Sequence, residues 1–477
     1  MVDIQIYSEW RRTMRKTAAL LIFSLIMFSF LVACYSVDMN PENPESQNVS
    51  GIWGVFISKE STVSFRYPEK NDSICSCNKG RSSSDPDTSI ELWNMTQKGL
   101  NVTATNVTTG APVASGFWSG GMLLLKGISA SWSANAVIWE KACCFEAIDT
   151  NGHRLHGIKM GGISAGCQTG MDKWETNQEN ALSANSSLIS TKAGVIEYKI
   201  LGDSGPYILA FHGGQGGYDQ IKAFAPGIIG KGFRILTWSR PGYLRTPLPA
   251  VSSPQDQADA ATALLDALGI DQVAAIGGSA GGPPLFYFAQ RHPDRIWALI
   301  AESAVSQTYT PHSEYPYVNE LVYMFTNPGG MWVFNAMFEY STEATIRILL
   351  RTLSTHDAVS FNAWIAQIMA NPDRINIIKT VILSMSPSTP RMDGTANDLA
   401  YDTQLGYLPL SEITTPTLVI HGTHDGDVDP VHAIYSKATI PGARLMWIEG
   451  GSHLLVLSDH ADEVNRAELD FLNSLKP

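Results

Sequence analysis

Residues 272–291 read QVAAIGGSAGGPPLFYFAQR, and they give the clearest indication of the fold class. Its first part, Gln272–Ile276, is a short apolar run typical of a buried strand, and the apolar residues after the glycines favour a helix. Between them Gly277, Ser279 and Gly281 form the pattern Gly-x-Ser-x-Gly. Small neighbours suit a tight, strained turn with a helix packed close behind it. The pattern therefore predicts a nucleophilic serine at the end of a strand.

Strand-like apolar runs alternate with helical patterns from Gly194 onward. The clearest helix, Pro254–Leu268, has Ser253 as its N-cap and proline at its first position. Apolar strands that alternate with helices predict a mostly parallel sheet covered on both faces, with reactive groups at the carboxyl ends of the strands. The predicted strands are Tyr207–Phe211, Phe233–Trp238, Gln272–Ile276, Trp297–Ala301, Thr417–Ile420 and Arg444–Ile448.

A second glycine-rich segment follows the strand at Tyr207–Phe211. It reads His212-Gly213-Gly214-Gln215-Gly216-Gly217. Acyl transfer generates an oxyanion, which needs two backbone N–H donors fixed before the reaction. The residue after the nucleophile, Ala280, supplies one of them. A phosphate cradle is the other common use of such a loop, but no Lys-Ser or Lys-Thr follows it here.

Two later strands run into an acidic loop and a histidine loop. Residues 421–430 read HGTHDGDVDP, and Arg444–Ile448 is followed by Gly450-Gly451-Ser452-His453. Serine, then acid, then histidine on the ends of successive strands is the chain order of the α/β-hydrolase family. Residues about 194–477 resemble this family in nucleophile elbow, oxyanion loop, acid loop and histidine loop.

The resemblance implies an α/β-hydrolase fold and a role for each of these residues. Ser279 is the nucleophile, Asp425 the acid and His453 the base. The two oxyanion donors are Ala280 and Gly214, with Gln215 as the alternative to Gly214.

Each role has rivals in the sequence. Asp427 or Asp429 could be the acid, but the family pattern His-Gly-x-x-Asp selects Asp425, and Glu302 is a more distant candidate. His460 falls on the final helix, so the histidine loop is preferred as the source of the base.

Metal chemistry is a further alternative for the acid loop. His421 and His424 have a spacing that could suggest metal ligands, but they lie in a turn and no third cluster is evident. We expect neither a metal site nor a cofactor.

Between about residues 303 and 411 the alternation of strands and helices stops and helical segments follow one another. This is where the family inserts its cap. The stretch Tyr315–Tyr340 is rich in aromatic residues and methionine, which suit an apolar acyl or aryl group. Residues Trp238–Tyr243 are expected to form a pocket edge, or Arg240 instead bonds neighbouring loops.

We expect a serine hydrolase that cleaves a carboxylic ester through an acyl-enzyme, with a small-molecule ester or acyl substrate. The same glycine motifs also resemble proline iminopeptidases, in which acidic cap residues hold a substrate amine; Glu314, Glu320 and Glu339 could serve. A third alternative is a non-catalytic surface-binding protein, but the retention of every catalytic element argues against it.

Composition excludes several classes of protein. The chain has 477 residues, 44% hydrophobic and 16% charged, which is typical of a folded protein of two or three domains. Its net charge of −12, without long basic runs, makes nucleic acid an unsuitable partner.

The first 34 residues predict export. Basic residues at positions 11–16 precede an apolar run, Ala18–Val32, as in a secretory signal. The end of the run, Leu31-Val32-Ala33-Cys34, resembles the lipobox of prokaryotic lipoproteins. The resemblance implies that Cys34 carries a lipid and anchors the protein to the extracytoplasmic side of a membrane, with residues 35–50 as a flexible tether. The alternatives are an ordinary secretory signal and an uncleaved signal helix.

Residues 51–176 predict a separate β-rich domain of unknown function. Short alternating runs are separated by turn residues such as Asp149–Gly152, which favours an antiparallel sandwich or small barrel. The remaining cysteines are Cys75, Cys77, Cys143, Cys144 and Cys167. We expect disulfides between the first pair and the others, with a zinc site as the alternative. The polar residues 177–193 are expected to form a linker.

Overall fold

The computed structural model describes residues 51–58, 89–98, 101–106, 111–119, 122–127, 133–139, 144–149, 154–161, 165–250, 252–310, 331–332, 334–335, 338 and 342–477. They belong to two compact units, Met1–Trp174 with Ala336–Thr345, and Glu175–Asn335 with Ile346–Pro477. The predicted signal segment with Cys34, the tether, Cys75, Cys77, Cys143 and the three cap glutamates lie outside the described residues.

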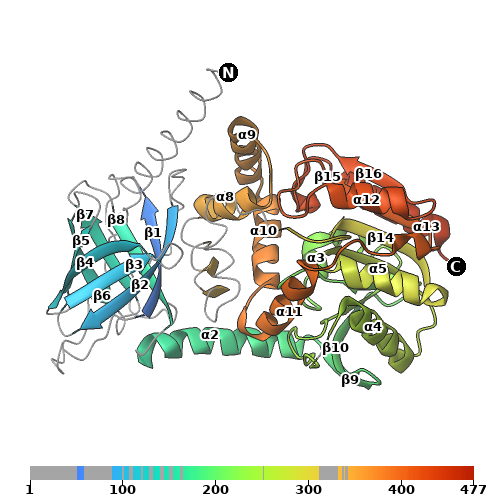
Figure 1. The fold of residues 1–477 in the computed structure, drawn as a ribbon, viewed down its shortest axis with the longest axis horizontal. Helices are drawn as coiled ribbons and strands as arrows, with labels where there is room; N and C mark the ends of the chain where they lie inside the picture. Colours follow the sequence, from blue (N-terminus) through green and yellow to red (C-terminus); the bar gives the residue numbers. More distant parts are fainter. Residues whose placement is uncertain are drawn as a thin grey trace. The chain divides into compact units, whose positions relative to one another are not determined.

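Eight strands of the first unit form a closed antiparallel barrel (Figure 1). Each strand pairs with the next in the chain, and β1 also pairs with β8. On β3, Val102 and Ala104 are buried and Thr103 between them is exposed, the alternation expected when one face of a strand lines a core. The strands are β1 (Gly51–Ser58), β2 (Ser89–Lys98), β3 (Asn101–Asn106), β4 (Pro112–Ser119), β5 (Met122–Gly127), β6 (Ser133–Trp139), β7 (Cys144–Asp149) and β8 (Arg154–Gly161).

The segment 177–193, which we expected to be a linker, is regular secondary structure. Helix α2 spans Ala165–Ala184, and strand β9 (Ser187–Thr191) pairs with β10 (Gly194–Leu201). None of the residues 177–193 is buried. The polar composition therefore reflects an exposed helix and an edge strand, and the linker prediction was wrong.

A mostly parallel sheet forms the centre of the second unit. Its strand order is β16-β15-β14-β13-β11-β12-β10-β9. The strands from β16 to β12 run parallel, β10 pairs antiparallel with β12, and β9 pairs antiparallel with β10. The predicted parallel strands are confirmed: β11 (Tyr207–Phe211), β12 (Arg234–Trp238), β13 (Val273–Ser279), β14 (Ile296–Ala304), β15 (Thr417–Gly422) and β16 (Arg444–Ile448).

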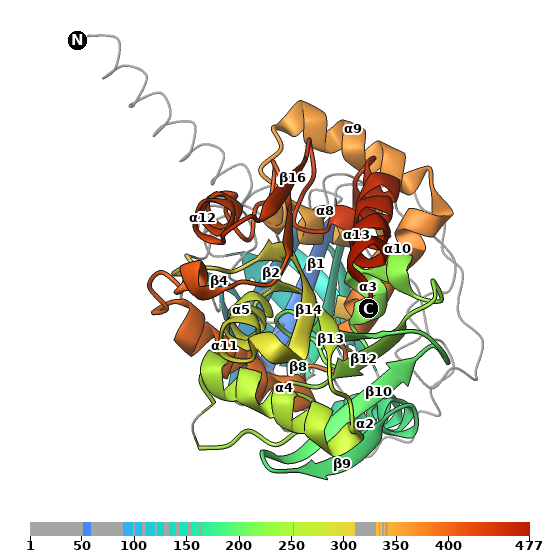
Figure 2. The same cartoon turned by 90° about the vertical axis from the view of Figure 1, so that its right-hand side faces the viewer.

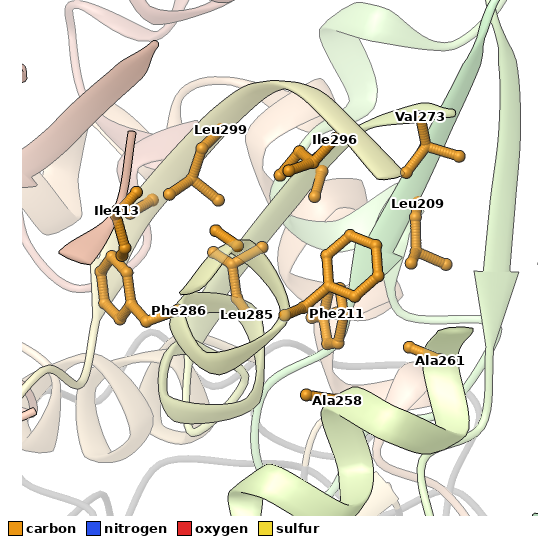
Figure 3. Packing of buried hydrophobic residues seen from close by; sticks show 14 of the residues in the cluster. Leu209, Phe211, Ala258, Ala261, Val273, Leu285, Phe286, Ile296, Leu299 and Ile413 are labelled. Atoms are coloured by element: carbon orange, nitrogen blue, oxygen red, sulfur yellow. The ribbon is translucent and has the colours of Figure 1, made fainter. Parts of the chain in front are cut away.

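Helices cover both faces of this sheet (Figure 2). Leu209 and Phe211 on β11 pack with helices on one face, while Ile208 and Ala210 pack with helices on the other. Figure 3 shows the first of these cores, to which Phe211, Leu285 and Phe286 all belong. The covering helices are α4 (Pro254–Leu268), α5 (Gly282–Arg291) and α12 (Val431–Thr439) on the first face, and α3 (Ile221–Phe224) and α13 (Ala461–Leu475) on the second.

The predicted ends of α4 are confirmed in detail. Ser253 accepts a hydrogen bond from the N–H of Asp256, whose side chain accepts in return from the N–H of Ser253. Gly269 ends the helix in the left-handed conformation, with φ of 65°.

Helices also replace strands after β14, as the sequence predicts for a cap. Part of the predicted cap, including residues 311–330, lies outside the described residues. No described helix is both long and apolar enough to cross a membrane. The described cap helices are α8 (Thr342–Thr352), α9 (Ala358–Met369), α10 (Pro372–Ser384) and α11 (Met392–Asp402).

Candidate active site

Ser279 lies on a strained turn between β13 and α5. Its φ is +51°, a left-handed conformation that costs a residue other than glycine free energy. A Cβ on Gly281 would lie 2.5 Å from the carbonyl oxygen of Phe211, so only glycine fits there. Gly277 is similarly close to Phe211, because its Cβ would lie 2.9 Å from the Cβ of that residue. The two glycines therefore allow the serine turn to pack against the end of β11.

The glycine-rich loop after β11 lies beside this turn. A Cβ on Gly213 would be 3.1 Å from the Cβ of Ser279, and one on Gly214 would be 3.9 Å from the Cβ of Ala280. Within the described part of the chain, the backbone N–H groups of Gly214 and Ala280 have no hydrogen-bond acceptor. Two backbone donors from neighbouring loops are therefore available next to the serine.

The ring of His212 holds the glycine-rich loop in place through hydrogen bonds and does not act as a base. Its Nε2 accepts a hydrogen bond from the backbone N–H of Arg240, so Nδ1 carries the proton and donates to the carbonyl of Gly213 at 2.7 Å. Burial, together with the nearby guanidinium of Arg240, holds the pKa of His212 well below its usual value. The ring is therefore neutral and holds the loop in place.

Arg240, which is wholly buried, fixes the same loop from one side. Its guanidinium donates to the carbonyl oxygens of His212 and Gly213, and it forms a two-pronged ion pair with Asp398 on α11 at 2.6 and 3.0 Å. Tyr243 donates to the same carboxylate at 2.6 Å. Of our two expectations for this segment, the bonds support the structural role of Arg240.

Arg391 fixes the loop from another side. This buried side chain donates to the carbonyl oxygen of Gly216 at 2.7 Å and pairs with Asp219 at 2.9 Å. It also donates to the carbonyls of Ser386 and Pro387, which follow α10. Both arginines therefore tie the glycine-rich loop to residues of the cap region, where the sequence alone showed no partner for them.

Asp425 and His453 are joined by a direct hydrogen bond. The Nδ1 atom of His453 lies 3.0 Å from Oδ2 of Asp425, which is 1% exposed. Burial alone would raise the pKa of Asp425, but His453 and the backbone N–H of Asp427 hold it below its usual value. The aspartate is therefore ionised and can orient the imidazole.

Of the rival residues, Asp427 contacts Nε2 of His453, whereas Asp429 and His460 have other partners. The carboxylate of exposed Asp429 accepts from the N–H of Val431 at the start of α12, and His460 pairs with Glu463 on α13. Glu302 is buried on β14, and burial raises its pKa to about 8. Its Oε2 atom has no hydrogen-bond partner among the described residues.

The segment Leu353–His356, which follows helix α8, links the acid loop and the histidine loop. The carbonyl oxygen of Leu353 accepts from the N–H of Gly426 at 3.2 Å and from the N–H of His453 at 3.0 Å. Thr355 donates to the carbonyl of His424 at 3.0 Å, and the ring of His356 stacks on the ring of His424. One carbonyl after helix α8 thus fixes the spacing between the acid loop and the histidine.

The hydroxyl of Ser279 makes no hydrogen bond with a described residue, and Nε2 of His453 instead lies 3.3 Å from Asp427. Catalytic hydrogen bonds are often long before substrate binds. The structure thus joins Asp425 to His453 and places the glycine-rich loop beside Ser279.

Among the described residues, no group of three or more His, Cys, Asp and Glu side chains is arranged to hold a metal ion.

Known proteins share this fold. The family model for the alpha/beta hydrolase fold matches residues 206–459. The uncharacterized hydrolase YcgS of Bacillus subtilis is 30% identical over 288 residues, which cover 60% of this chain and 98% of that protein. A 2-hydroxy-6-oxononadienedioate/2-hydroxy-6-oxononatrienedioate hydrolase of Dechloromonas aromatica is 24% identical, over 62% of this chain and 98% of its own.

A solved structure gives the same result. The alpha/beta hydrolase fold protein from Nakamurella multipartita has a TM-score of 0.56 and 32% identity, covering 61% of this chain and 99% of its own. The fold is therefore the alpha/beta hydrolase fold, with a mostly parallel sheet covered by helices. The chain belongs to the alpha/beta hydrolase family.

The ion pair beneath the glycine-rich loop gives a stability prediction. Asp398→Asn would remove the carboxylate that pairs directly with the buried guanidinium of Arg240, and we expect the free energy of unfolding to fall by about 3–5 kcal/mol. The control is Asp266→Asn, the same change in an exposed partner of Arg295, where we expect a loss of about 1 kcal/mol or less. Urea denaturation measures both; equal losses would contradict the structural role of the buried pair.

Proposed function

We propose that the protein is a serine hydrolase that cleaves a carboxylic ester of a small molecule through an acyl-enzyme. Ser279 is the nucleophile, His453 the base and Asp425 the acid. The observation that carries the proposal is the hydrogen bond between Asp425 and His453 at 3.0 Å, on the loops that follow β15 and β16. Those loops lie at the carboxyl ends of strands in the same sheet as β13, which ends at the strained Ser279.

In the first half-reaction, neutral His453 removes the proton from Ser279 Oγ as that oxygen attacks the ester carbonyl carbon. Asp425 holds the proton of the ring on Nδ1 and stabilises the imidazolium that forms. The imidazolium then gives its Nε2 proton to the departing alcohol, and the acyl group remains on Ser279. In the second half-reaction, water attacks the acyl group with His453 again acting as base, which releases the acid and restores the serine.

The N–H groups of Ala280 and Gly214 stabilise the negative oxygen that forms in each half-reaction. Each such donor contributes about 3–4 kcal/mol when it is held in position beforehand. The bonds from Arg240 and Arg391 to the loop carbonyls support this role, because they hold the glycine-rich loop in place before any substrate arrives.

Two other functions fit less well. The aminopeptidase alternative depends on Glu314, Glu320 or Glu339, which lie outside the described residues. The non-catalytic alternative gives no reason for a strained serine turn beside two unpaired backbone donors. A panel of p-nitrophenyl esters, lactones and aminoacyl-naphthylamides separates these functions directly.

Removing the serine hydroxyl tests the proposal. We expect Ser279→Ala to lower kcat for p-nitrophenyl acetate by at least about 10³-fold, because the acyl-enzyme cannot form. The matched control is Ser303→Ala at the end of the neighbouring strand, where the hydroxyl has no partner among the described residues. Its kcat should stay close to that of the wild type. Undiminished turnover by Ser279→Ala would refute the assignment.

We also propose that the chain is exported and anchored through a lipid on Cys34, outside the cytoplasm. The supporting observation is the sequence Leu31-Val32-Ala33-Cys34 at the end of the apolar run. On this proposal the β-rich unit and the hydrolase unit both act on the outer side of the membrane.

The anchor has its own test. Cells that express the protein and are fed radiolabelled palmitate should incorporate label into the wild type and not into Cys34→Ala, since that thiol is the acceptor. Cys167→Ala serves as the control for general effects of cysteine loss. Equal labelling of Cys34→Ala and the wild type would exclude the lipid anchor.

A further inference from the structure

A second carboxylate contacts the imidazole of His453. Oδ2 of Asp427 lies 3.3 Å from Nε2, on the opposite side of the ring from the Nδ1 atom that faces Asp425. The other oxygen of Asp427 accepts a hydrogen bond of 2.6 Å from the hydroxyl of Tyr309. Tyr309 follows β14 and thereby fixes the direction in which the carboxylate points.

This arrangement fits one protonation state of the ring. A neutral imidazole has one N–H and one lone pair, so it can donate to only one of two carboxylates. An imidazolium donates from both nitrogens and can satisfy Asp425 and Asp427 together. A lone pair on Nε2 would instead face the negative charge of Asp427.

We propose that Asp427, oriented by Tyr309, is a positioning residue that holds His453 as an imidazolium in the free enzyme. Nε2 becomes available to Ser279 only after its proton leaves and the contact with Asp427 opens. This inference rests on the proposed serine-hydrolase function and adds a control of the pH at which that site works.

The other groups around the ring agree with this role. Burial lowers the pKa of His453, but Asp425, Asp427 and Glu302 outweigh it and raise the pKa to about 9. Asp427 is the one of these carboxylates that lies at Nε2. Glu302 has a pKa of about 8 itself and is largely protonated at neutral pH.

Two further groups complete the surroundings. Burial lowers the pKa of His421 on β15, so this ring is neutral. Burial, together with the charge of Glu302, raises the pKa of Glu468 on α13 well above its usual value. The carboxylates in direct contact with the ring of His453 are therefore Asp425, which the mechanism requires, and Asp427, which it does not.

The proposal is tested by measuring the pKa of the His453 ring. In the full-length chain with ¹³Cε1-labelled histidine, an NMR titration gives the pKa of His453, whose signal is assigned by its loss in His453→Gln. Asp427→Asn should lower that pKa by about one unit, because an opposite charge has been removed next to the ring. Tyr309→Phe should lower it by less. Asp429→Asn, which removes a charge from the same loop away from the ring, should leave it unchanged.

The pH dependence of ester hydrolysis provides a second test of the role of Asp427. When a base is mostly protonated at the working pH, a decrease of one unit in its pKa makes up to about ten times more of the neutral base available. Asp427→Asn should therefore raise kcat/KM for p-nitrophenyl acetate at pH 7 by up to about tenfold and move the acidic limb of the pH profile down, with no such change in Asp429→Asn.

The results separate this inference from the proposed function. An unchanged His453 pKa in both Asp427→Asn and Tyr309→Phe overturns the role of Asp427, and the two variants together guard against misfolding of either one. The titration needs no turnover and is repeated in Ser279→Ala. If Ser279→Ala keeps full activity while the pKa still falls in Asp427→Asn, the hydrolase mechanism fails and the contact stands.

Discussion

The buried carboxylate of Asp425 is the group on which the arrangement of the site depends. It accepts hydrogen bonds from Nδ1 of His453 and from the backbone N–H groups of Asp427 and Val428, so it fixes the acid loop and the ring together. An ionised carboxylate at 1% exposure is stable only when it is bonded in this way. The side chain that orients the imidazole thus also holds its own loop folded.

The cap region supplies the remaining constraints. The carbonyl of Leu353 bonds the acid loop and the histidine loop at once, and Arg391 and Arg240 bond the glycine-rich loop. Buried ion pairs add little net stability, because desolvation offsets much of their attraction. Their effect here is to fix loop carbonyls before substrate binds, which is what stabilisation of a transition-state charge requires.

The pattern of the sequence predicted the sheet and the serine turn because both depend on local features. Apolar runs such as Tyr207–Phe211 define strands, and the small residues around Ser279 allow one tight turn. The pairing of Arg240 with Asp398 could not be predicted, since 158 residues separate them and nothing local marks either one. Helix α2 was missed for a different reason: its residues 177–184 are not buried, and their polar sequence resembles that of a linker.

Asp427 illustrates a further limit. The sequence placed it among the candidate acids, two residues after Asp425, but which nitrogen of the ring it contacts depends on the fold of both loops. The same holds for Tyr309, whose hydroxyl orients that carboxylate. Residue type and spacing thus predict which residues belong to the candidate site, and the packing of the loops determines which of them are in contact.

The most direct test of the account is the position of a covalent adduct. After reaction with a fluorophosphonate, mass spectrometry of the digested protein should find the phosphonyl group on Ser279, and the rate of labelling should fall in His453→Gln because the hydroxyl loses its base. An adduct confined to another serine, or the absence of any adduct on folded protein, would contradict the proposal that Ser279 is an activated nucleophile.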